Sequence, residues 1–168
     1  MNGPTSRAIT LVVAVVAAAV SALSAEPAAQ NQQGVMPAAA QYNPGVGDMM
    51  NTNVQSRHAK LGLAVREENW PLAFYTLREL RQAFDNIARV HPKWRNLSLD
   101  EMIESVMSKP LRDTEEAIRG RDVEKLAASY AHMTEGCNAC HAAVNYSFIV
   151  IKAPEQSQFP NQDFHAVK

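Results

Sequence analysis

The sequence predicts an all-α protein, folded as an antiparallel four-helix bundle. Between residues 48 and 151, apolar side chains recur every three or four positions in four separate segments, which is the spacing of one helix face. The connections between the segments are short, as in bundles whose consecutive helices run in opposite directions. No segment shows the alternation of apolar and polar residues that is typical of a strand.

The first two helices are expected over residues 49–67 and 69–90. Asp48 and Asn69 precede them, and their side-chain oxygens can accept hydrogen bonds from the first helical turns. The second helix should end before Pro92, because the residue that precedes a proline disfavours the helical backbone conformation.

The third and fourth helices are expected to begin after Ser98 and Asp122. Ser98, with Glu101 three residues later, resembles a capping box. Pro110 lies inside the third segment, where an interior proline costs about 3 kcal/mol, so we expect a kink or a break there. Gly120 is suited to the end of the third helix. The fourth helix should continue to about residue 151, with Phe148 on its inner stripe.

The first 25 residues predict a secretory signal, and the protein is expected in the periplasm. Arg7 is followed by an apolar run over residues 9–20 and then by small residues, in the order of an export signal. This run is shorter than the ~20 residues that span a bilayer, so no membrane span is expected in the mature chain.

The rest of the chain divides into three parts. Residues 26–47 are rich in Ala, Gln, Pro, Asn and Gly and predict a flexible linker. Residues 48–152 form the helical domain, and residues 153–168 predict an irregular tail without helical periodicity. The net charge of −1 and the lack of a basic run give no support for binding nucleic acid.

Both cysteines of the chain lie in the pentapeptide Cys137-Asn138-Ala139-Cys140-His141. The pattern C-x-x-C-H is typical of covalent haem attachment. Each thiol can add to one vinyl group of the porphyrin, and the histidine can reach the iron. Residues three or four apart share a helix face. We therefore predict one haem c, held by Cys137 and Cys140, with His141 as an axial iron ligand.

Two other uses of the cysteines compete with haem. A structural zinc site needs about four grouped ligands, whereas the remaining histidines are scattered singly. A redox dithiol normally follows a strand at the start of a helix, whereas this motif lies inside a helical segment. An exported helical dithiol protein stays open as the alternative without haem.

The motif near the end of the last helix in a four-helix chain resembles the cytochrome c′ superfamily, over about residues 48–151. The resemblance implies a periplasmic haem protein whose sixth iron site is either open to small gases or filled by a ligand from the first helix. It also implies that Arg57 meets a haem propionate, that Leu61 covers an open sixth site, and that homodimers form through the first two helices.

His58 and Met50 leave the sixth iron site undecided. His58 lies on the apolar stripe of the first helix, where a neutral imidazole can bind iron or can be a hydrogen-bonded core residue. Met50 can ligate through its thioether or can simply fill the core. The leading prediction is a monohaem electron carrier with periplasmic redox partners. The alternative is a five-coordinate, cytochrome c′-like protein that binds NO or CO. No motif supplies a general acid or base, so we predict no enzyme.

Overall fold

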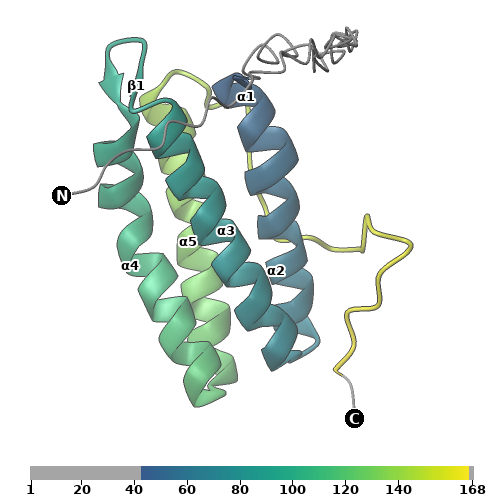
Figure 1. Ribbon diagram of the computed structural model, residues 1–168. Coiled ribbons are helices and arrows are strands. Elements are labelled where there is room, and N and C mark those ends of the chain that lie inside the picture. The colour runs from purple at the N-terminus through teal and green to yellow at the C-terminus, as the bar shows by residue number, and fades with distance from the viewer. Residues whose placement is uncertain (1–42, 167–168) are drawn as a thin grey trace, which may run out of the picture. The chain divides into compact units, whose positions relative to one another are not determined.

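The computed structural model describes residues 43–166 and is mostly helical with little sheet, which confirms the all-α prediction (Figure 1). The expected signal, residues 1–25, and linker residues 26–42 lie outside the described part. Within residues 43–166, no helix has the length and apolar character needed to cross a bilayer. The elements are α1 Val46–Met49, η1 Met50–Gln55, α2 Ser56–Arg66, α3 Trp70–Val90, β1 Lys93–Trp94, β2 Leu97–Ser98, α4 Leu99–Gly120 and α5 Val123–Ala143.

The segments α1, η1 and α2 follow one another without a break, because the junction residues Met50 and Ser56 keep right-handed helical dihedrals. The central part is a π-helix, a form that is rare and often found at functional sites. The helix begins at Val46, and Gly45 precedes it without a side-chain cap. The predicted cap at Asp48 is therefore wrong, and this carboxylate instead lies in the first turn, where the helix dipole favours it.

Two predicted caps are confirmed. The Asn69 side chain accepts a hydrogen bond from the Leu72 amide at 3.2 Å. The Asp122 side chain accepts one from the Lys125 amide at 3.0 Å. Each bond joins residues three positions apart, so it depends on local sequence alone.

The predicted capping box at Ser98 is wrong. Ser98 makes no side-chain cap bond, and the Leu99 amide donates to the Pro92 carbonyl at 2.9 Å. This bond closes the antiparallel hairpin of β1 and β2, which the sequence did not predict. Each strand has only two residues, too few for an alternating pattern.

Pro110 does not interrupt α4, contrary to the expected break. A proline removes the amide that would bind the carbonyl four residues earlier, here that of Val106. That carbonyl lies against Gly136 of α5, where an added Cβ would be 3.4 Å from its oxygen. The proline is thus accommodated where α4 and α5 approach closely.

The helices α4 and α5 both end with a residue in the left-handed conformation. After α4 this residue is Arg121, with φ 52°, and Gly120 is the last helical residue. After α5 it is Asn145, with φ 64°, and the Tyr146 amide donates to the His141 carbonyl at 2.7 Å. This is the Schellman arrangement, in which Asn can replace Gly.

The α5 helix therefore ends well before residue 151. The side chain of Asn138 binds the backbone of Ile151 twice, accepting from its amide at 2.7 Å and donating to its carbonyl at 2.9 Å. Phe148, predicted on the inner stripe, is 77% exposed. Residues 144–151 are a loop that folds back along α5.

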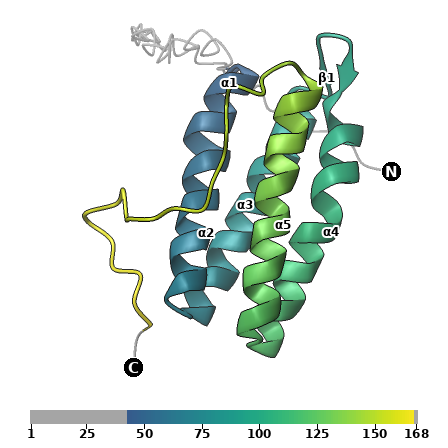
Figure 2. The ribbon, with the colours of Figure 1, turned by 180° about the vertical axis from the view of Figure 1, so that it is seen from behind.

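The helices pack in pairs around one apolar core. The α3 helix packs on α2 and on α4, and α5 packs on α4 and on α2 (Figures 1 and 2). The largest fully buried apolar side chains come from all of these helices: Leu61, Leu63, Leu77, Leu80, Ile87, Met107, Leu126 and Met133.

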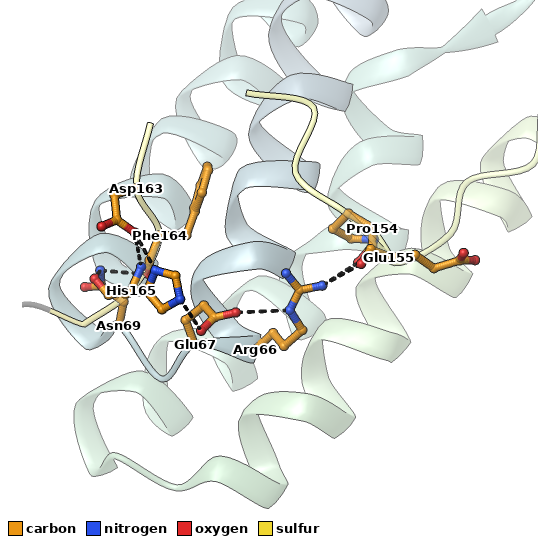
Figure 3. A network of polar contacts seen from close by, with 8 residues as sticks. All are labelled: Arg66, Glu67, Asn69, Pro154, Glu155, Asp163, Phe164 and His165. Atoms are coloured by element: carbon orange, nitrogen blue, oxygen red, sulfur yellow. Dashed lines mark hydrogen bonds and ion pairs between the residues drawn. The ribbon is translucent and has the colours of Figure 1, made fainter. Parts of the chain in front are cut away.

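The described part of the tail, residues 153–166, has no helix or strand, as predicted, and it packs on α2 and the start of α3 (Figure 3). Arg66 donates to the Glu155 carbonyl at 2.9 Å, and the Asn69 side chain donates to the Phe164 carbonyl at 3.1 Å. Phe164 is buried.

Candidate haem site

A cavity of about 1070 Å³, including space open to solvent, lies between the first helix and the C-terminal half of α5. Figure 1 shows α1, the β hairpin and the end of α5 at the same end of the molecule. Cys137, Cys140 and His141 all line this cavity, together with mainly apolar side chains from α4 and the 144–151 loop. A concave, mainly apolar lining of this kind is typical of cofactor sites.

The hydrogen bond of His141 fixes which ring nitrogen is free. Its Nδ1 lies 2.9 Å from the carbonyl oxygen of Ile149. A carbonyl only accepts, so Nδ1 carries the proton and Nε2 keeps its lone pair. Metal-bound histidines commonly donate their other N–H to a carbonyl in this way. His141 is therefore in the tautomer that an axial ligand requires.

The two thiols lie in surroundings that suppress their ionisation. Burial raises the pKa of Cys137 to about 12, and burial also raises the pKa of Cys140 above its ordinary value. Neither residue is in a disulfide. Redox-active dithiols depend on a lowered thiol pKa. The cavity therefore suits apolar thioether links better than dithiol exchange.

His58 lines the floor of the cavity, and both of its ring nitrogens have partners on α5. The Thr134 hydroxyl donates to the Tyr130 carbonyl at 3.0 Å, so it accepts from His58 Nε2 at 2.9 Å. The Tyr130 hydroxyl lies 3.2 Å from Nδ1, and the two rings stack with centroids 4.8 Å apart. Burial lowers the pKa of His58 to about 4, so the ring is neutral near pH 7. His58 has the arrangement of a hydrogen-bonded core residue.

Met50, the first residue of η1, also lines the cavity and lies nearer the level of His141. His58 faces Thr134 through its hydrogen bond. Met50 is eight residues before His58, at most about 12 Å along the helix because the π-helix η1 rises less per residue than an α-helix, and His141 is about 10 Å beyond Thr134. Met50 and His141 are therefore both displaced from the His58–Thr134 hydrogen bond toward the cavity that they line. Met50 is thus the better placed of the two candidate ligands.

Arg57 and Leu61 do not line the cavity. Arg57 donates to the Asn53 carbonyl at 2.9 Å and lies 3.5 Å from a carboxylate oxygen of Glu79. Leu61 is fully buried in the core. The structure brings Cys137, Cys140, His141 and His58 to one cavity and leaves Arg57 and Leu61 outside it.

Two contributors to the site were missed in the sequence. Ile149 supplies only its backbone carbonyl to His141, which no side-chain pattern reveals. Trp94 lines the cavity from β1, a two-residue strand that the sequence did not predict. The signal for the loop was Asn145, a residue type that tolerates the left-handed conformation where a helix stops.

Among residues 43–166, no three His, Cys, Asp or Glu side chains cluster in a way that could hold a metal ion. Comparisons with protein-family models, with curated proteins and with solved structures give no match to this chain.

Proposed function

We propose that this chain is a periplasmic monohaem c-type cytochrome that transfers electrons, built as an antiparallel four-helix bundle. The observation that carries the proposal is the meeting of Cys137, Cys140 and His141 in one apolar cavity, with His141 Nε2 free to bind iron. When bound, the haem supplies an iron that alternates between the ferric and ferrous states.

Each residue of the site has a distinct task in this proposal. Cys137 and Cys140 hold the porphyrin through thioethers, and His141 binds the iron. The Ile149 carbonyl orients the imidazole and makes it a stronger donor. Met50 supplies the second axial ligand from the opposite helix.

The Met50 assignment favours electron transfer over gas binding. The Met50 thioether and the His141 imidazole would together leave no ligand position of the iron open to a gas, so little rearrangement would accompany a change of oxidation state. His58 then keeps its bonds to Tyr130 and Thr134 and joins α2 to α5. The apolar lining excludes water from the iron, which helps to set the potential.

Absorption spectroscopy tests the proposal on the full chain, exported together with haem-attachment machinery. The wild type should carry covalent haem and show a low-spin spectrum that carbon monoxide does not change after reduction. Met50→Ala should become high-spin and bind carbon monoxide. Met102→Ala is the matched control, because Met102 also lines the cavity but comes from α4, and it should stay low-spin.

Three results would contradict the proposal in different ways. Exported protein without covalent haem refutes the cytochrome itself. A high-spin wild type that binds carbon monoxide supports the gas-binding alternative. A low-spin Met50→Ala that loses its spectrum only when His58 is also replaced would return the ligand role to His58.

A further inference from the structure

The side chain of Arg95 lies at the rim of the cavity, against two residues that line it. Arg95 is exposed and follows β1 in the turn of the hairpin. Its guanidinium carbon lies 4.5 Å from the ring centre of Trp94 and 5.3 Å from that of Tyr146. It also donates a hydrogen bond to the Tyr146 hydroxyl at 2.8 Å. The hairpin and the 144–151 loop are thus joined through one arginine.

The backbone of Arg95 is in a conformation that normally calls for glycine. Its φ is 55°, a left-handed value at which a side chain is sterically unfavourable. Residues 95 and 96 are the two-residue turn between β1 and β2, and such turns commonly place a residue at positive φ. The contacts with Trp94 and Tyr146 fix the direction of the Arg95 side chain.

Arg95 has no carboxylate partner among the described residues. Arg57 and Arg81 do have such partners, in Glu79 and Glu115, but these two arginines do not line the cavity. None of the described residues that line the cavity is Lys, Arg, Asp or Glu. The rim therefore presents an unneutralised guanidinium beside an uncharged apolar space.

We propose that Arg95 binds a haem propionate, and that Trp94 and Tyr146 position it for this. The proposal rests on the proposed function, since propionates are the only carboxylates that a haem brings to the cavity. Guanidinium and carboxylate form the strongest hydrogen-bonded ion pairs available to side chains. Stacking on the two rings orders the guanidinium before it meets the anion. This role replaces the one that the family resemblance implied for Arg57.

Titration of free haemin into the Cys137→Ala/Cys140→Ala chain separates this pairing from all other contacts. Arg95→Gln in that background should bind haemin about tenfold more weakly, which is the size of one charge-assisted hydrogen bond. Haemin dimethyl ester has no free carboxylates, so its affinity should change less than twofold. Arg95→Lys should recover part of the haemin affinity.

Arg57→Gln and Arg112→Gln are the matched controls, and both should leave haemin binding unchanged. Arg112 is an exposed residue of α4 that does not line the cavity. An equal loss for haemin and its ester in Arg95→Gln overturns the proposal, as does no loss at all. An ester-sensitive loss confined to Arg57→Gln also overturns it.

The covalently loaded full chain gives a second measurement that does not depend on the alanine background. Phenylglyoxal should modify Arg95 more slowly in the loaded protein than in haem-free protein, with Arg112 in the same sample as reference. Equal rates overturn the propionate pairing. Absence of covalent haem in the exported wild type instead refutes the cytochrome, so the two failures are distinguishable.

Discussion

Replacing Gly62 by alanine should destabilise the protein, although alanine is the better helix former. Gly62 lies inside α2, where an added Cβ would be 2.3 Å from the Tyr130 hydroxyl and 2.7 Å from Cδ of Pro154. Because the close approach is to Tyr130 and to the tail, this glycine allows tight packing of α2 against both.

The expected magnitude follows from opposing effects. Alanine gains about 1 kcal/mol of helix propensity over glycine. Tyr130 is 5% exposed and stacks on His58, so its ring has little room to move. Overpacking of this kind costs about 1–3 kcal/mol. Displacing the hydroxyl from its bonds to His58 adds about 1–3 kcal/mol for a buried unsatisfied group. The net loss of unfolding free energy should be about 1–5 kcal/mol.

Urea denaturation of the wild type and Gly62→Ala measures this loss directly. Gly120→Ala is the matched control, since an added Cβ there has nothing within 4 Å, and this variant should be neutral or slightly stabilised. In a Tyr130→Phe background the cost of Gly62→Ala should shrink, because the closest atom is gone. A Gly62→Ala protein as stable as the wild type would refute the packing argument.

Two further predictions concern the buried histidine and the loop. The unfolding free energy should fall as the pH drops from about 6.5 to 4, because His58 has a pKa of about 4 when folded and about 6.5 when unfolded. The loss should be at most about 3 kcal/mol and should be absent from the denaturation curves of a folded His58→Gln variant, whereas an unchanged pH dependence contradicts the assignment. Asn138→Ala should speed amide exchange at Ile151 and lower stability by about 1–3 kcal/mol, as it removes both bonds that fold the loop back. Exchange at the wild-type rate would show that other contacts hold the loop.

Features of this chain that depend on residues close in sequence could be predicted, and features that depend on contacts between distant segments could not. Asn69 caps α3 through an amide three residues away, and the sequence predicts it correctly. Ser98 offered the same local pattern, but the Leu99 amide binds Pro92 across a hairpin. The backbone bond across the hairpin is present, and the local side-chain cap from Ser98 is not. Pro110 also differs from its local expectation, since α4 continues through it where α4 lies against Gly136 of α5.

The same distinction divides the candidate site. Cys137, Cys140 and His141 share a face because their spacing lies within one helix, and the structure brings them to one cavity. Which residue of the first helix faces His141 depends on how that helix is placed along α5. The hydrogen bond between His58 and Thr134 sets this placement, and no local pattern encodes it. Met50 and His58, the two candidate ligands on the first helix, therefore lie about two turns apart.

The early end of α5 is what completes the histidine side of the site. If the helix had continued to residue 151, the Ile149 carbonyl would lie two turns beyond His141 and could not accept from its ring. Instead, the helix ends at Asn145, which has a left-handed backbone conformation. The two hydrogen bonds between the Asn138 side chain and the Ile151 backbone return the chain alongside the helix. Only then does the Ile149 carbonyl reach Nδ1 and leave Nε2 free for iron. The end of α5 at Asn145 and the side-chain amide of Asn138 thus fix the tautomer of His141, which the C-x-x-C-H motif alone does not determine.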